Sequence, residues 1–308
     1  MQTYCGIDIG GTQIKIGLFG IDGTLLNKWA IDTNKENNGQ FILEEIYTFL
    51  KETIDMTDCL GFGFGVPGPV KDDIVLECVN LGWGKTNVKA LFQALVGQEK
   101  IITVDNDANV AALGEATFGA GDHALNTVML TLGTGVGGGI ILNGVILKGV
   151  NGSAGELGHM PMVDDGFLCG CGKHGCLETL TSATGVKNLA RMYLEEGRLS
   201  SRLSLEEDFS AKYVFDNAKR GDEVGLKVVD DVAYYLAKAC AQIAVTVDPE
   251  SFIFGGGVSA AGDFLFDKVK AYYQTLAFKA VRDVLFKPAE LGNDAGIYGA
   301  FMAVKNHG

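Results

Sequence analysis

The stretch YCGIDIGGTQIKIGLF, Tyr4–Phe19, contains two apolar or alternating runs that Gly10-Gly11-Thr12 separates. This spacing predicts two strands, Tyr4–Ile9 and Ile14–Phe19, joined by a tight turn. A second turn at Asp22-Gly23 is followed by LLNKWAID, which predicts a third strand. The chain is therefore expected to begin with three strands in succession, each connected to the next by a hairpin.

Beyond this meander, the periodicity of the apolar residues predicts helices and strands in alternation, and then a second meander. The first half continues with helix 38–53, strand Leu60–Val66, helix Val88–Leu95, strand Ile101–Val104 and helix Ala108–Thr117. The second half has strands Thr127–Leu132, Gly138–Leu142, Val145–Leu147 and Ser251–Phe254, and helices Ala183–Glu196, Ala211–Lys219, Gly221–Val247, Phe264–Thr275 and Ala295–Lys305. We therefore predict two α/β halves with a boundary near residues 119–126.

Composition limits the classes of partner and the compartment. The 308 residues, 47% of them hydrophobic, suffice for one large or two ordinary domains. A net charge of −13 argues against nucleic acid and anionic membranes as partners. The first residues lack the features of a signal peptide, and no uncharged apolar run reaches membrane-spanning length. We therefore expect a cytoplasmic protein with reduced thiols.

Two glycine loops follow the first strands of the two halves, at Asp8–Thr12 and at Leu132–Gly135. The glycines from Gly133 to Gly138 match G-x-G-x-x-G, but they lead into a predicted strand rather than the helix that a dinucleotide site requires. No P-loop motif is present. Either loop alone is best read as an ordinary hairpin turn. The pair together, with Asp8 ahead of the first, predicts turns that hold phosphate through N–H groups and threonine hydroxyls.

The segment VDNDANVAALGE, Val104–Glu115, places several polar side chains between a strand and a helix of small residues. Asn106 or Asp107 could simply cap that helix. A carboxylate at the carboxyl end of a strand in an open α/β sheet is also a plausible general base. The residues alone leave both interpretations open.

Three cysteines, Cys169, Cys171 and Cys176, follow His159 and surround His174. Three cysteines and one histidine are the usual ligands of a closed structural zinc site. His174 lies inside the cysteine loop, where simultaneous ligation is awkward, so His159 is the preferred fourth ligand. The alternative is three buried reduced thiols. The other four cysteines, at positions 5, 59, 78 and 240, lie in apolar contexts and are expected in the core.

Taken together, these motifs resemble the ROK sugar-kinase family. The matching segments are DIGGT (Asp8–Thr12), GVPGPV (Gly65–Val70), NDAN (Asn106–Asn109), LGTGVGGG (Leu132–Gly139), AGELGH (Ala154–His159) and CGCGKHGCLE (Cys169–Glu178). The segments NLGW (Asn80–Trp83) and LETLTSATG (Leu177–Gly185) look most similar to bacterial glucokinases of this family. One departure is Asp105, where many members have Glu.

The resemblance implies an actin-like ATPase (ribonuclease H-like) fold, with two α/β domains and an active-site cleft between them. It implies a small domain of residues 1–119 plus a returning C-terminal helix, 295–308. A larger domain, 120–294, would carry the zinc loop.

The resemblance also implies a role for each motif residue. Asp107 would be the general base, and MgATP would lie with Asp8 near the magnesium. The substrate-binding residues would be Gly68, Asn80, Asn106, Asp107, Glu156, His159 and Glu178. The ATP-binding residues would be Asp8, Gly10, Gly11, Thr12, Gly133, Thr134, Gly135 and Gly256. Structural zinc would be held by His159, Cys169, Cys171 and Cys176.

The implied activity is ATP-dependent phosphorylation of a hexose, first of all glucose to glucose 6-phosphate. Alternatives are a kinase for another hexose or N-acetylhexosamine, such as fructose or N-acetylmannosamine, and a sugar-responsive transcriptional regulator without its DNA-binding domain. A homodimer is expected by the same resemblance.

Overall fold

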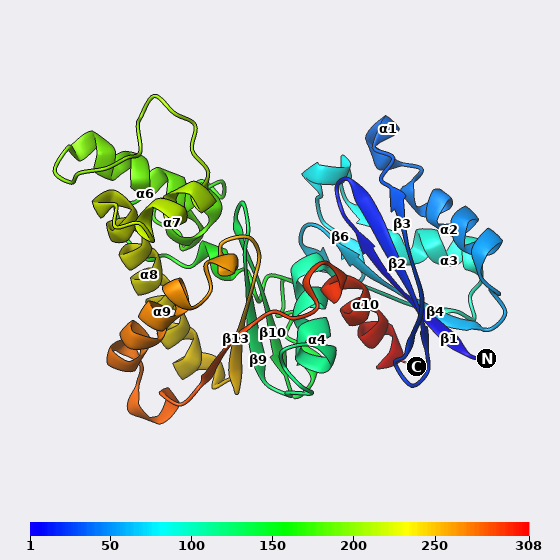
Figure 1. The fold of residues 1–308 in the computed structure, drawn as a ribbon. Helices are drawn as coiled ribbons and strands as arrows, with labels where there is room; N and C mark the ends of the chain where they lie inside the picture. Colours follow the sequence, from blue (N-terminus) through cyan, green and yellow to red (C-terminus); the bar gives the residue numbers. More distant parts are fainter. Residues whose placement is uncertain (308) are drawn as a thin grey trace. The chain divides into compact units, whose positions relative to one another are not determined.

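The computed structural model describes residues 1–307 (Figure 1). Contacts group the chain into two compact units. Unit 1 contains Met1–Leu125, Gly139–Gly155 and the residues from Glu290 onward, and unit 2 contains Asn126–Gly138 and Glu156–Ala289. This grouping assigns residues 139–155 to unit 1, and the domain boundaries expected from the sequence stay a prediction.

The sheet of unit 1 has the strand order β3-β2-β1-β4-β8. Its strands are β1 (Thr3–Ile9), β2 (Gln13–Gly20), β3 (Leu25–Asp32), β4 (Cys59–Val66) and β8 (Ile101–Asn106). Strands β1, β2 and β3 form an antiparallel meander, as the opening sequence predicts, and β4 and β8 continue it in parallel with β1. The carboxyl ends of β1, β4 and β8 therefore lie at the same edge.

Helices cover both faces of this sheet. Helices α2 (Ile42–Thr53) and α3 (Val88–Val96) bury Ile46 and Phe92 in one core with alternate residues of β1, such as Ile7. Helix α10 (Ala295–Lys305) packs on the other face, where Phe301 stacks on Phe19 with ring centroids 4.4 Å apart. The last helix therefore returns to the first sheet, in accordance with the expectation (Figure 1).

Glycines in the strands allow α10 to lie directly on the sheet backbone. A Cβ atom at Gly63 would lie 1.8 Å from the carbonyl oxygen of Ala300, and one at Gly6 would lie 2.0 Å from that of Ile297. Both separations are far inside van der Waals contact. Gly6 of β1 and Gly63 of β4 therefore serve the packing of this helix on the sheet.

The second sheet has the order β11-β10-β9-β12-β13. Its strands are β9 (Thr127–Leu132), β10 (Val136–Leu142), β11 (Val145–Ile146), β12 (Ser251–Gly255) and β13 (Leu285–Pro288). Strand β12 is parallel to β9 and β13, and β10 and β11 are antiparallel. The glycine loop after β9 leads into strand β10, which agrees with the exclusion of a dinucleotide site.

The remaining elements complete the two units. Unit 1 also has helices α1 (Glu36–Gly39) and α4 (Asp107–Phe118), and a small antiparallel sheet of β5 (Val70–Lys71), β6 (Ile74–Val75) and β7 (Thr86–Asn87). Unit 2 has helices α5 (Glu178–Thr181), α6 (Ala183–Glu196), α7 (Ala211–Ala218), α8 (Glu223–Val247) and α9 (Asp263–Leu276). Short 3-10 helices are η1 (Val79–Leu81), η2 (Leu157–His159), η3 (Ser259–Ala261), η4 (Lys279–Val281) and η5 (Gly292–Asp294). Within residues 1–307, none of the helices has the length and apolar character needed to cross a membrane.

Candidate functional site

The turn from β8 to α4 positions Asn106, which is predicted to bind the sugar, and Asp107, which is predicted to be the general base. The Asn106 side chain is the N-cap of α4, because its Oδ1 accepts hydrogen bonds from the N–H groups of Ala108 (2.9 Å) and Asn109 (3.2 Å). Its Nδ2 donates to the carbonyl oxygen of Gly68 at 3.0 Å. Asp107 is the first helical residue, with Oδ1 2.8 Å from the N–H of Ala108. The capping role thus falls to Asn106 rather than to Asp107.

Asp8 lies at the end of β1, just before the first glycine turn. Burial raises the pKa of its carboxyl group to about 6, the Asp107 carboxylate adds to this rise, and Lys15 opposes it. Two carboxylates that repel one another in a partly dehydrated place are well suited to a divalent cation, whose charge would favour both ionised forms.

The other predicted residues of unit 1 belong to the same strand-end region. The first turn is closed by a hydrogen bond from Gly10 N–H to the Gln13 carbonyl oxygen at 3.0 Å. A Cβ at Gly11 would lie 3.7 Å from Cβ of Asn80, so these two predicted ligands are neighbours. Gly68 has a positive φ of 98°, which favours glycine. Open α/β sheets bind ligands at such an edge.

The second glycine turn is braced by residues of unit 2. The Gly133 N–H donates to the Gly135 carbonyl oxygen at 3.0 Å, and the Thr184 hydroxyl donates to the Thr134 carbonyl oxygen at 2.9 Å. Oε2 of Glu178 accepts from the Val136 N–H at 3.1 Å. A Cβ at Gly135 would lie only 2.2 Å from that oxygen, so a larger residue would collide with Glu178.

A cavity of about 280 Å³ lies beside this turn and is lined by Thr134, Gly135, Leu168, Cys169, Gly170, Glu178, Thr179, Ser182, Thr184 and Asn188. Gly256 is close to the same turn, because its Cβ would lie 2.5 Å from the Leu132 carbonyl oxygen. The residues predicted to bind phosphate and nucleoside in the second half therefore form one region of unit 2.

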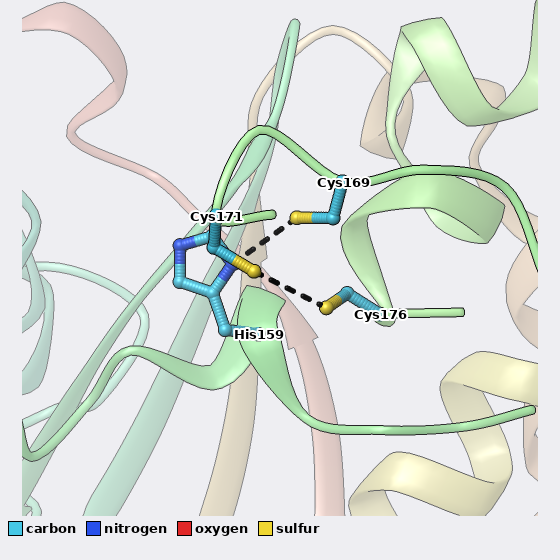
Figure 2. Close-up of side chains that lie close together, drawn as sticks. All are labelled: His159, Cys169, Cys171 and Cys176. Carbon is cyan, nitrogen blue, oxygen red and sulfur yellow. Dashed lines mark hydrogen bonds between the residues drawn. The ribbon is translucent and has the colours of Figure 1, made fainter. Parts of the chain in front are cut away.

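The four predicted zinc ligands come together in unit 2 (Figure 2). The donor atoms of His159, Cys169, Cys171 and Cys176 all lie within 4.8 Å of one another. Sγ of Cys169 is 3.4 Å from Nδ1 of His159, and Sγ of Cys171 is 3.7 Å from Sγ of Cys176.

These separations agree with tetrahedral zinc. Zn–S bonds of about 2.3 Å and Zn–N bonds of about 2.0–2.1 Å place tetrahedral ligands about 3.8 Å (S···S) and about 3.6 Å (S···N) apart. All seven cysteines are free, so no disulfide competes for the thiols. Burial raises the pKa of the Cys169 thiol to about 12, which makes it a poor nucleophile without a metal.

The second histidine lies outside the cluster. Nδ1 of His174 is 2.9 Å from the Gly166 carbonyl oxygen, and the side chain is exposed. His159 instead has Nδ1 toward Cys169 and Nε2 3.9 Å from Oε2 of Glu156. The ring of His159 therefore lies between the cysteine cluster and Glu156, which is predicted to bind the sugar.

Two buried carboxylates, Asp105 and Glu115, have several partners that the sequence does not indicate. Asp105 accepts from the Asn109 side chain at 2.8 Å and forms an ion pair with Lys148 at 2.8 Å. Glu115 is fully buried and accepts backbone N–H groups from nearby Ala120 and from the distant residues Glu290 and Leu291. An acidic residue within the small apolar residues of α4 was the signal for Glu115. Nothing local pointed to Lys148.

Comparisons with known proteins cover nearly the whole chain. The family model described as "ROK family" matches residues 4–307. The chain is 43% identical to a glucokinase of Halalkalibacterium halodurans over 99% of its own length and 95% of the relative, and 37% identical to a glucokinase of Thermotoga maritima over 97% and 96%. The solved ROK glucokinase of Streptomyces griseus, in complex with glucose and AMPPNP, is 31% identical, with a TM-score of 0.74 and 99% of each chain covered.

The ROK hexokinase of Thermus thermophilus is 26% identical and has a TM-score of 0.85 over 99% of each chain. The α/β sheets described above and these structural matches confirm the actin-like ATPase fold that the motifs predict. With the family model matching from the first strand to the last helix, the chain belongs to the ROK family.

Proposed function

We propose that this protein is an ATP-dependent glucokinase, which transfers the γ-phosphoryl group of MgATP to the 6-hydroxyl of glucose and acts in the cytoplasm. The observation that carries the proposal is Asp107, a carboxylate at the start of α4 that is not needed as the helix cap. The 43% identity to a glucokinase over 99% of the chain supports glucose as the acceptor.

In the proposed reaction, Asp107 accepts the proton of the attacking hydroxyl. A sugar hydroxyl is a weak acid, but in a loose phosphoryl-transfer transition state the proton leaves late, so a carboxylate suffices as the acceptor. Asn106, Asn80 and the backbone of Gly68 would orient the sugar. Glu156, His159 and Glu178 would accept or donate hydrogen bonds to its other hydroxyls.

The protein's larger task is to align the substrate and stabilise charge on the transferred group. The N–H groups and threonine hydroxyls of turns Gly10–Thr12 and Gly133–Gly135 would hold the phosphates, with Gly256 beside the nucleoside. Asp8 would bind the Mg²⁺ that arrives with ATP, and its raised pKa supports this assignment because a cation would relieve the repulsion from Asp107.

Zinc would be held by His159, Cys169, Cys171 and Cys176, and it would supply structural stability rather than catalysis, since four protein ligands close the coordination sphere. With Nδ1 of His159 directed to the cluster, Nε2 is left for the sugar and for Glu156. Glu178 lies next to the cluster as well, with Oε1 3.5 Å from Sγ of Cys169.

A second candidate is a kinase for a different acceptor. Relatives at 29–30% identity include an N-acetylgalactosamine kinase of Shewanella and an N-acetyl-D-glucosamine kinase of Erwinia tasmaniensis. The higher identity to glucokinases favours glucose.

The test is a panel of hexoses and N-acetylhexosamines at fixed MgATP, with ADP release as the readout. The proposal predicts that glucose has the highest kcat/KM. If the protein phosphorylates N-acetylmannosamine or fructose but not glucose, the proposed substrate is wrong, whereas the proposed sugar-kinase activity stands.

We also propose a homodimer, and light scattering coupled to gel filtration should give twice the 32.7 kDa chain mass. A monomer at micromolar concentration would contradict it.

A further inference from the structure

Lys148 forms an ion pair with Asp105, which lies two residues before the proposed base Asp107. Its Nζ lies 2.8 Å from Oδ2 of Asp105, whose side chain is only 6% exposed. The other oxygen of Asp105 accepts hydrogen bonds from the Asn106 N–H and the Asn109 side chain, both at 2.8 Å. One oxygen of this buried carboxylate is therefore hydrogen-bonded, and one of its bonds reaches the backbone next to Asp107, whereas Oδ2 has the ion pair with Lys148 but no hydrogen bond within the described residues.

The same lysine begins the segment that leads to the predicted sugar ligands of unit 2. The Lys148 carbonyl oxygen accepts from the Ala154 N–H at 3.1 Å, which closes the loop between them. Gly152 in this loop packs against β5, because its Cβ would lie 2.2 Å from the Val70 carbonyl oxygen. Glu156 is the second residue after Ala154. Lys148 therefore lies at the start of the segment that leads to Glu156.

Charge makes the pair more than a packing contact. Asp8, Asp105 and Asp107 all belong to the strand-end region of unit 1. The negative charge of Asp107 contributes to the raised pKa of Asp8. Lys148 is the cation paired with Asp105, and without it a buried carboxylate would be left uncompensated beside the proposed base. A charge in that position would also push the Asn106–Asp107 turn away from its present geometry.

We propose that Lys148 is a positioning residue for phosphoryl transfer, which acts through Asp105 to fix the turn that carries Asp107 and the start of the loop before Glu156. This inference rests on the proposed glucokinase function. Lys148 is half-exposed, so its side chain can be exchanged without opening a core cavity.

The experiment compares Lys148→Met, Lys148→Arg and the double variant Asp105→Asn/Lys148→Met with the wild-type chain. Misplacement of a reacting group by about 1 Å can cost on the order of 100-fold in rate, so Lys148→Met should lower kcat for glucose by about 10- to 100-fold. KM for ATP should change by less than about twofold, since the phosphate turns are untouched. Lys148→Arg, which keeps the cation, should recover most of kcat. Lys51→Met, an exposed lysine on α2, is the matched control and should behave as wild type.

Should Lys148→Met fail to fold, the double variant removes both charges and keeps the test valid. It should fold and still show the low kcat, because the link is absent. Wild-type kcat in either Met-containing variant, or no rescue by Lys148→Arg, would overturn the positioning role while glucokinase activity stands. A wild-type chain that phosphorylates no hexose would instead overturn the proposed function, and this inference with it.

Discussion

Replacing Glu115 by Gln should destabilise unit 1 without touching the proposed chemistry. The buried Glu115 carboxylate accepts N–H groups from Ala120 (3.1 Å) and Glu290 (3.0 Å) on Oε2 and from Leu291 (2.7 Å) on Oε1. It thereby fastens the end of α4 to the segment that leads into α10. An amide keeps the shape but has only one acceptor atom. If that oxygen serves Ala120 and Glu290, the NH₂ group faces the N–H of Leu291 as donor against donor.

One hydrogen bond to a charged group is worth about 1.5–3 kcal/mol, so Glu115→Gln should cost about 2 kcal/mol. For a unit of this size, that corresponds to a fall in Tm of about 4–8 °C. Glu115→Ala leaves all three N–H groups without this acceptor and should cost about 4 kcal/mol or more. Glu52→Gln, at an exposed position of α2, is the control and should change Tm by less than about 1 °C. Thermal unfolding by circular dichroism measures all three, and a Tm of Glu115→Gln equal to that of the control would show that the Glu115 hydrogen bonds do not stabilise unit 1.

Three further predictions concern the proposed site. Asp107→Asn should lower kcat by about 10²–10⁴-fold with glucose binding retained, and a variant with more than about a tenth of wild-type kcat would rule Asp107 out as the base. Metal analysis should find one zinc per chain in the wild type and in His174→Ala but none in Cys171→Ser, whose glucose KM should rise; full zinc in Cys171→Ser would show the ligands to be wrong. Asp8→Asn should abolish turnover yet stabilise the protein at pH 7.5 by about 3 kcal/mol, because a folded pKa of about 6 against 3.8 means that ionised Asp8 opposes folding. The gain should shrink as pH falls from about 6 to about 4 and vanish below that, where Asp8 is protonated in both the folded and the unfolded state, and a lower Tm for Asp8→Asn at pH 7.5 would contradict it.

Much of the fold follows from local sequence. Apolar patterning sufficed for β9, α6 and α10, whose observed bounds equal the predicted ones, because the two helices repeat their signal over several turns and β9 is a continuous apolar run. The two-residue strands β5, β6 and β7 were missed, since two residues carry no alternation. Strand β13 was missed as well, because its LFKP sequence is short and ends in proline, which fits an edge strand.

The candidate site was predictable where its residues cluster in the sequence. The His159 and cysteine spacing indicated a metal site, and the structure gathers those four side chains. Whether Asn106 or Asp107 caps α4 depended on side-chain rotamers that a sequence does not specify. The Lys148–Asp105 pair joins residues far apart in the chain, so only the folded structure could reveal it.

The γ-phosphoryl group of ATP should be transferred to the 6-hydroxyl of glucose. The most direct measurement is NMR analysis of a reaction that contains purified protein, glucose, ATP and Mg²⁺. We expect glucose 6-phosphate and ADP in equal amounts, no product when Mg²⁺ is chelated, and about 10²–10⁴-fold slower product formation when Asp107→Asn replaces the wild-type chain. ATP that stays intact in the presence of glucose, or a phosphate on a different hydroxyl, would contradict it.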